Sequence, residues 1–165
     1  MAEDKPPVYL VDPDSDPVTV KICGRASYQN SAPLQAFFQA MIAQGKSNFR
    51  LEFGLCTAMD STFLGIIAGA AIQAGKQLPP GKLYLSSLEQ RNLQLIRNLG
   101  LHRLTEIEEI PVIAEKEHKL EALEGEGVVN RGTMLEAHQT LSGIDEANRE
   151  KFQDVVAFLK KESGD

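Results

Sequence analysis

The stretch Cys56-Thr57-Ala58-Met59-Asp60-Ser61-Thr62-Phe63-Leu64-Gly65 joins a strand-like run at residues 48–55 to an apolar, small-residue run at 66–72. Asp60, Ser61 and Thr62 are residue types that favour the N-cap of a helix. A helix that begins here gathers free backbone N–H groups and hydroxyls at the positive end of its dipole. The stretch therefore predicts a strand-to-helix junction that favours an anion and at which a hydroxyl could acquire one.

Composition restricts the class of protein. The chain has 165 residues, of which 42% are hydrophobic, and a formal net charge of -6. These values suit one domain with an appendage and a substantial core. An acidic chain without a basic stripe argues against nucleic-acid binding and against a polybasic membrane anchor. The longest apolar run, residues 63–72, is too short for a membrane span, which needs roughly 20 residues. The N-terminus lacks signal-peptide features, which predicts a cytoplasmic location.

Hydrophobic periodicity predicts the element order β-β-α-β-α-β-α-β. Strands are expected at residues 8–11, 18–24, 48–55, 82–86 and 104–107, and helices at 31–44, 61–74 and, capped by Ser87, at 88–99. Helices alternating with strands after a first hairpin predict an α/β fold, with a mixed, mostly parallel sheet of four to five strands and helices packed on it. In such sheets function gathers at the carboxyl ends of strands, where residues 24–27, 56–62 and 86–87 all lie.

The chain beyond about residue 112 has a different pattern. Residues 115–127 hold five glutamates, two lysines and two glycines, which predicts a solvated linker or a frayed helix. Two amphipathic helices follow. The capping-box pattern at residues 133–136 begins the first, and the second runs from Asp145 with an apolar stripe at Phe152, Val155, Val156 and Leu159. That stripe must be buried on the domain, on a second copy or on a partner. We therefore divide the chain into a domain at 8–112 and a C-terminal helical extension at 113–165, and homo-oligomerisation through 133–160 stays open.

Cysteine and histidine carry no catalytic or metal-binding signature. Cys23 and Cys56 lie in apolar, strand-like context, which predicts two buried thiols in a reducing compartment, although a disulfide between them stays open. The histidines at positions 102, 118 and 138 share no ligand spacing with each other or with the cysteines, so surface or capping histidines are expected. A nucleophile pair of Cys56 with a distant histidine has no local signature. We expect no metal, no cofactor and no enzyme activity.

The segment Met59-Asp60-Ser61-Thr62-Phe63-Leu64-Gly65 resembles the phosphorylation loop of the STAS-domain anti-sigma factor antagonists. Their motif is an apolar residue, Asp, Ser, then Ser or Thr, a small or apolar residue, Leu and Gly. Residues 81–85 are similar to the family's fourth strand and residues 98–104 to its leucine-glycine-leucine helix end, so the resemblance covers about residues 8–110. The chain departs from the family where Ser27 replaces a frequent acid after strand two and where Phe63 replaces a frequent glycine.

The resemblance implies that Ser61 is a phosphoacceptor, with Thr62 as the second candidate. It implies that the unmodified protein binds a serine-kinase anti-sigma factor and so frees a sigma factor. The kinase would phosphorylate Ser61 and release the complex, and a serine phosphatase would reset it. The candidates for the loop and the partner surface are Met59, Asp60, Thr62, Phe63, Leu64, Ser27 and Ser86. The alternative is a non-catalytic STAS scaffold or adaptor that assembles through its C-terminal helices.

Overall fold

A six-stranded sheet forms the centre of the protein, whose computed structural model describes residues 8–109 and 119–162. The strands are β1 (Tyr9–Asp12), β2 (Val18–Ala26), β3 (Phe49–Met59), β4 (Leu83–Ser86), β5 (Glu106–Glu108) and β6 (Glu121–Ala122). Their order is β5-β4-β3-β2-β1-β6. The strands from β2 to β5 run parallel, and β1 is antiparallel to both of its neighbours. The predicted mixed, mostly parallel sheet is confirmed, with one strand more than expected.

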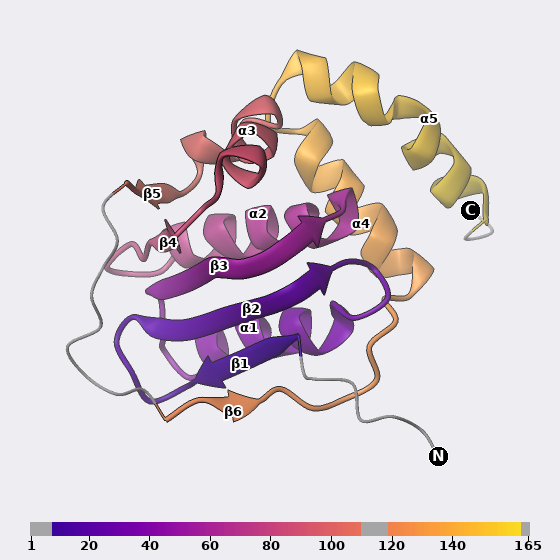
Figure 1. Ribbon diagram of the computed structural model, residues 1–165. Coiled ribbons are helices and arrows are strands. Elements are labelled where there is room, and N and C mark those ends of the chain that lie inside the picture. The colour runs from indigo at the N-terminus through magenta and orange to yellow at the C-terminus, as the bar shows by residue number, and fades with distance from the viewer. Residues whose placement is uncertain (1–7, 110–118, 163–165) are drawn as a thin grey trace.

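Helices cover one face and one end of this sheet. They are α1 (Ala32–Ala43), α2 (Ser61–Gly75), α3 (Gln90–Asn98), the 3-10 helix η1 (Leu101–Arg103), α4 (Arg131–Ser142) and α5 (Glu146–Glu162). Figure 1 shows α1 and α2 behind the sheet, and α4 at the end toward which the arrowheads of β2 and β3 point. Within the described residues, no helix is both long enough and apolar enough to cross a membrane.

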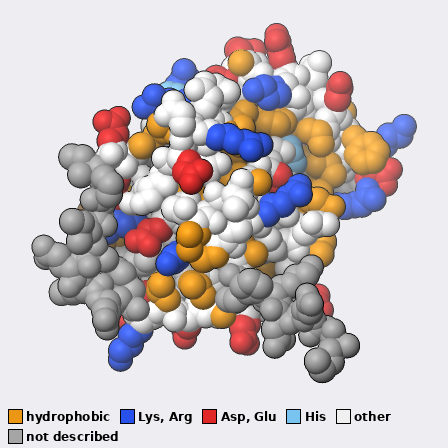
Figure 2. Space-filling view, viewed as in Figure 1, with side chains coloured by type: hydrophobic (Ala, Val, Ile, Leu, Met, Phe, Trp, Pro, Cys, Tyr) orange, Lys and Arg blue, Asp and Glu red, His pale blue; other side chains and the backbone are white. Residues whose placement is uncertain are grey.

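The core lies between the sheet and the two helices behind it. Along β3, Phe49, Leu51 and Phe53 are fully buried while the intervening Arg50 and Glu52 are only half-buried. This alternation arises because successive side chains of a strand point to opposite faces. Figure 2 shows the other face, on which positive, negative and hydrophobic side chains are interspersed. The visible part of that face therefore carries no large surface of a single charge.

The sixth strand corrects part of the prediction for residues 115–127. Glu121 and Ala122 form β6, which pairs with Leu10 and Val11 of β1, while residues 119–120 and 123–127 form neither a helix nor a strand. The backbone N–H of Val129 further donates to the carbonyl of Tyr28 at 2.8 Å. An edge strand leaves a row of unpaired backbone groups, and this segment satisfies those of β1. Residues 110–118 lie outside the described residues, and so does the predicted boundary between 112 and 113.

Three local predictions were wrong in detail. Strand β3 continues to Met59, four residues past its predicted end at residue 55, because it stays paired with the end of β2 despite two shifts in register. Ser87 does not cap α3; it has a positive φ of 60°, and α3 begins at Gln90. The capping box at 133–136 is not formed either, since the Asn130 side chain caps α4 by accepting the Thr133 N–H at 2.8 Å.

The C-terminal hairpin, which we define as α4 and α5, residues 131–162, packs on α2. The closest approach is at Gly65, where a Cβ atom would lie 2.6 Å from the Cβ of Ala137, so only glycine fits there without a shift. Leu141 of α4 is fully buried. Asn148 of α5 is also fully buried, and its Nδ2 donates to the carbonyls of Leu99 (2.8 Å) and Leu141 (2.9 Å). These contacts tie the start of α5 to the ends of α3 and α4.

The apolar stripe of α5 is largely buried within the protein. Phe152 and Leu159 are buried, and Val155 and Val156 are half-buried against the core. Most of the stripe is covered by α4 of the same hairpin, which was not among the three occupants left open by the sequence. Phe158, which is 58% exposed, remains uncovered on α5.

Candidate functional site

The junction between β3 and α2 is organised by the carboxylate of Asp60. Oδ1 accepts the backbone N–H of Phe63 at 2.9 Å, which makes Asp60 the N-cap of α2. Oδ2 accepts the N–H of Tyr28 at 2.8 Å, and Tyr28 lies in the loop after β2. One side chain therefore satisfies an orphan donor of the helix and fixes the neighbouring loop. The predicted capped junction is confirmed, with a second anchor that the sequence did not indicate.

The loop after β2 is held by buried polar groups. The carbonyl of Ser27 accepts the Ser31 hydroxyl at 2.6 Å, and the Asn30 Oδ1 accepts the Ser27 N–H at 3.0 Å. The same Asn30 oxygen accepts the Tyr9 hydroxyl at 3.0 Å, and burial raises the pKa of Tyr9 above its ordinary value. Ser31 occupies the N-cap position of α1 but makes no side-chain cap bond, because its hydroxyl serves this loop. Ser27 is buried, and its role as a partner contact stays a prediction.

Ser61, the first residue of α2, is half-buried and its hydroxyl has a partner from the C-terminal hairpin. Its Oγ lies 2.8 Å from Nε2 of His138 on α4. The other ring nitrogen, Nδ1, lies 2.7 Å from the carbonyl of Met134. A carbonyl only accepts, so Nδ1 carries the proton of the neutral ring and Nε2 accepts the Ser61 O–H. The ring is buried and meets Phe152 edge-on, with 5.6 Å between centroids.

His138 is the site residue that sequence reasoning missed, because it was predicted as a surface or capping histidine. It lies 77 residues from Ser61, so no local spacing connects the two. A signal was nevertheless present, since position 138 lies on the same helical face as Met134, Ala137 and Leu141. A polar ring on an apolar helix face must find a hydrogen-bond partner when that face is buried.

Several predicted contact residues are part of the core. The Phe63 ring is fully buried and stacks on Tyr9, with 6.3 Å between centroids. Leu64, Thr62 and Ser86 are also buried. The first turn of α2 faces the sheet and the hairpin covers its other side, while Ser86 ends β4 within the sheet. Their role as partner contacts stays a prediction. Of the predicted loop residues, those with partly exposed side chains are Met59, Asp60 and Ser61.

The junction between β3 and α2 lies in a part of the chain that matches a known protein family. A family model described as "Mlab, STAS domain" matches residues 10–107, more than half of the chain. The chain belongs to the STAS-domain family. The C-terminal hairpin lies outside the matched residues, so the STAS domain contributes Ser61 and the extension contributes His138.

Two solved structures share the fold of this STAS domain. One is the anti-sigma factor antagonist SpoIIAA in its unphosphorylated form, with a TM-score of 0.51 and 14% identity over 62% of this chain and 88% of that chain. The other is the Bacillus cell fate determinant SpoIIAA in the phosphorylated form, with a TM-score of 0.50 and 15% identity over 61% of this chain and 90% of that chain. A search of curated proteins found no significant match.

The cysteines of the STAS domain are both free, so the disulfide left open by the sequence is not formed. Cys56 is buried as predicted, whereas Cys23 is half-buried. Burial raises the pKa of the Cys56 thiol to about 11, so the unreactive protonated form dominates at neutral pH. Among the described residues, no group of three or more histidine, cysteine or acidic side chains could hold a metal ion.

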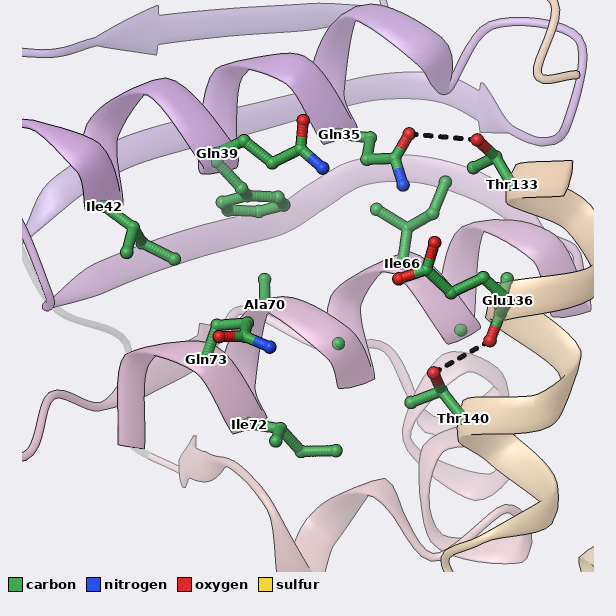
Figure 3. Close-up of a pocket in the computed structure, with 14 residues that line it drawn as sticks. Gln35, Gln39, Ile42, Ile66, Ala70, Ile72, Gln73, Thr133, Glu136 and Thr140 are labelled. Atoms are coloured by element: carbon green, nitrogen blue, oxygen red, sulfur yellow. Dashed lines mark hydrogen bonds between the residues drawn. The ribbon is translucent and has the colours of Figure 1, made fainter. Parts of the chain in front are cut away.

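A groove of about 150 Å³ lies between α1, α2 and α4 (Figure 3). Its floor is apolar and its rim is made of amides, hydroxyls and one carboxylate. Gln35 from α1 accepts the Thr133 hydroxyl at 3.3 Å across the groove. The lining residues are Gln35, Phe38, Gln39, Ile42, Gly65, Ile66, Gly69, Ala70, Ile72, Gln73, Thr133, Glu136, Ala137 and Thr140. Ser61 is not among them, so the groove and the junction are separate features.

Proposed function

We propose that this STAS protein is an anti-sigma factor antagonist, and that phosphorylation of Ser61 switches its binding to a serine-kinase anti-sigma factor. The unmodified protein binds the kinase and frees a sigma factor, and the phosphorylated protein releases the kinase. A serine phosphatase resets the cycle, which regulates sigma-factor-dependent transcription in the cytoplasm. The protein itself is not an enzyme in this scheme.

The observation that carries the proposal is the position of the Ser61 hydroxyl. It is half-buried, follows the N-cap residue Asp60 directly and lies at the carboxyl end of the central strand β3. Backbone N–H groups and the helix dipole at this position favour an anion. The fold shared with SpoIIAA, which is known in an unphosphorylated and a phosphorylated form, supports the same assignment.

Phosphorylation would act on the interface more than on the fold. A phosphate adds roughly -1.5 to -2 charge at neutral pH. The α2 N-terminus stabilises this charge, whereas a partner surface pressed on Ser61 would bury it beside the Asp60 carboxylate. Each 1.4 kcal/mol lost changes the affinity about tenfold, so a modest repulsion is enough for release. The contact surface that remains accessible is Met59, Asp60 and Tyr28, the last of which is 40% exposed.

The test uses the full chain and a candidate serine kinase with ATP. We expect phosphopeptide mapping to place one phosphate on Ser61, with no incorporation into Ser61→Ala and unchanged incorporation into Thr62→Val. Ser61→Asp should weaken binding to the kinase about tenfold or more, measured by calorimetry. A phosphate on Thr62 or elsewhere, or equal affinity of the wild type and Ser61→Asp, would refute the assignment.

The second candidate function is the non-catalytic STAS scaffold, and Phe158 is the observation that favours it. This ring is 58% exposed on α5, next to the half-buried Val155. Removing residues 128–165 is a poor test, because it would also uncover the apolar side of α2. Phe158→Asp leaves the hairpin's buried residues intact. If the wild type is an oligomer by light scattering and Phe158→Asp is a monomer, the scaffold is supported; monomers in both refute assembly through this face.

A further inference from the structure

The C-terminal hairpin holds His138 at a fixed place beside Ser61. The backbone of α4 touches α2 at Gly65 and Ala137, where there is no room for even one extra methyl group. Leu141, one turn further along α4, is fully buried, and Asn148 fastens the turn between α4 and α5 to the STAS domain. The position of the ring is thus set by backbone packing and not by the single hydrogen bond to Ser61.

The hydrogen bond between Ser61 and His138 cannot survive phosphorylation in its present form. Nε2 now accepts the proton of the Ser61 hydroxyl, and a phosphorylated Oγ has no proton to give. The outer phosphate oxygens lie two bonds beyond Oγ, and in the dianion they are acceptors only. Because Nδ1 is committed to the Met134 carbonyl, Nε2 must take up a proton and become a donor to pair with them.

We propose that His138 is the receptor within this chain for the phosphate on Ser61, and that phosphorylation clamps the C-terminal hairpin onto α2. This inference rests on the proposed modification of Ser61. In the transfer, Oγ forms a bond to the γ-phosphorus of a nucleoside triphosphate held by the kinase, and the bond to the departing nucleoside diphosphate breaks. The hydroxyl proton passes to Nε2, so the ring becomes an imidazolium paired with the phosphate.

The surroundings of the ring favour this pairing. On the α2 side the neighbouring ionisable group is Asp60, whose carboxylate already accepts two backbone N–H groups. On the α5 side the ring meets the uncharged Phe152, and the neighbouring charges Lys151 and Asp154 are exposed. On α4 itself Glu136 lines the groove toward α1 (Figure 3). A charge-assisted hydrogen bond to phosphate is about twice as strong as the neutral bond it replaces.

Clamping of the hairpin would give phosphorylation a second way to exclude a partner. The phosphate would repel a partner at the loop and at the same time hold α4 across the apolar side of α2. A partner that needs this side of α2 would be excluded by the hairpin as well as by the charge. The unmodified protein has the weaker, neutral bond at the same place, so its hairpin opens more readily.

The test introduces phosphoserine at position 61 of the full chain by genetic encoding, so that no kinase is needed. Hydrogen–deuterium exchange at pH 7.5 then reports the opening of α4. We expect exchange in α4 to slow about tenfold on phosphorylation, as a charged hydrogen bond replaces a neutral one. Ring ¹⁵N chemical shifts should show both nitrogens of His138 protonated in the phosphoprotein, and Nε2 unprotonated in the unmodified protein.

Two variants isolate the ring. His138→Phe keeps a ring against Phe152 and removes both nitrogens, and His138→Gln keeps a donor without the charge. The protection caused by phosphorylation should vanish in His138→Phe, be reduced in His138→Gln and persist in His102→Gln, which changes an exposed histidine. Unchanged or faster exchange of α4 in the phosphoprotein, or protection that persists in His138→Phe, would overturn the inference. Failure of every kinase to modify Ser61 would refute the proposed function but leave this result standing.

Discussion

The contact between Gly65 and Ala137 offers a direct test of the docked hairpin. The perturbation is one methyl group, introduced by Gly65→Ala, and the matched control is Gly69→Ala one turn further along α2. At Gly65 a Cβ would lie 2.6 Å from both the carbonyl carbon and the Cβ of Ala137, whereas at Gly69 it would meet nothing within 4 Å. Both substitutions change helix propensity equally, by about 1 kcal/mol in favour of alanine.

The magnitude follows from the space available. Ordinary contacts of a Cβ begin at 3.4 Å, and the Ala137 carbonyl oxygen lies nearer than the two atoms at 2.6 Å, so α4 would have to retreat by at least about 0.8 Å to admit the methyl group of Gly65→Ala. Overpacking of this kind costs about 1–3 kcal/mol. Because propensity cancels between the two variants, the free energy of unfolding of Gly65→Ala should lie about 1–3 kcal/mol below that of Gly69→Ala.

Urea denaturation followed by circular dichroism measures this difference. In a domain of this size each 1 kcal/mol corresponds to about 2–4 °C in Tm. Gly69→Ala should be as stable as the wild type or more stable, and hydrogen exchange in α4 should accelerate in Gly65→Ala alone. If the two variants unfold within about 0.5 kcal/mol of each other, the hairpin does not dock on α2 in solution, and His138 is not held beside Ser61.

Three other substitutions or conditions test the STAS domain. Asp60→Ala should lower the free energy of unfolding by about 1–2 kcal/mol, since the cap and the second anchor are both lost, while Asp60→Asn should cost less in the same urea titration. Cys56 should resist thiol reagents until the pH approaches 11, because burial raises its pKa from 9.0 to about 11. As the pH rises, the Cys56 thiol loses its proton in the unfolded chain before it does so in the folded protein. The stability that this thiol contributes is therefore present below pH 9 and is lost between pH 9 and 11. Rapid labelling of Cys56 at pH 8, mapped by mass spectrometry, would contradict its burial. Glu108→Gln should lower the free energy of unfolding by about 1 kcal/mol, because the Glu108 carboxylate contacts Arg50 at 2.7 Å and both side chains are partly buried. Glu106→Gln, which changes an exposed side chain, should change this free energy little. Equal effects of the two substitutions would contradict a special role for the ion pair of Arg50 and Glu108.

Local sequence patterns were enough for much of the fold. The order of strands and helices up to residue 109 followed from periodicity and turn residues, because strand and helix periods differ. The cap at Asp60 followed from its place between a strand and an apolar run. The weak points were the ends of elements, such as β3, whose last four residues depend on pairing with β2. Strand β6 was not predicted for the same reason. Its residues form a strand because they pair with the edge of β1, and their own composition does not indicate one.

The sequence by itself therefore determined the α/β sheet, the junction at residues 56–65 and the position of Ser61 at the start of a helix. These depend on neighbours within a few residues. Only the tertiary structure decided which residues of the junction are exposed, because Phe63 and Leu64 are buried by the sheet and by helices distant in sequence. It alone brought His138 within 2.8 Å of Ser61. Contacts between segments 77 residues apart arise from the packing of whole helices, and no local pattern records that packing.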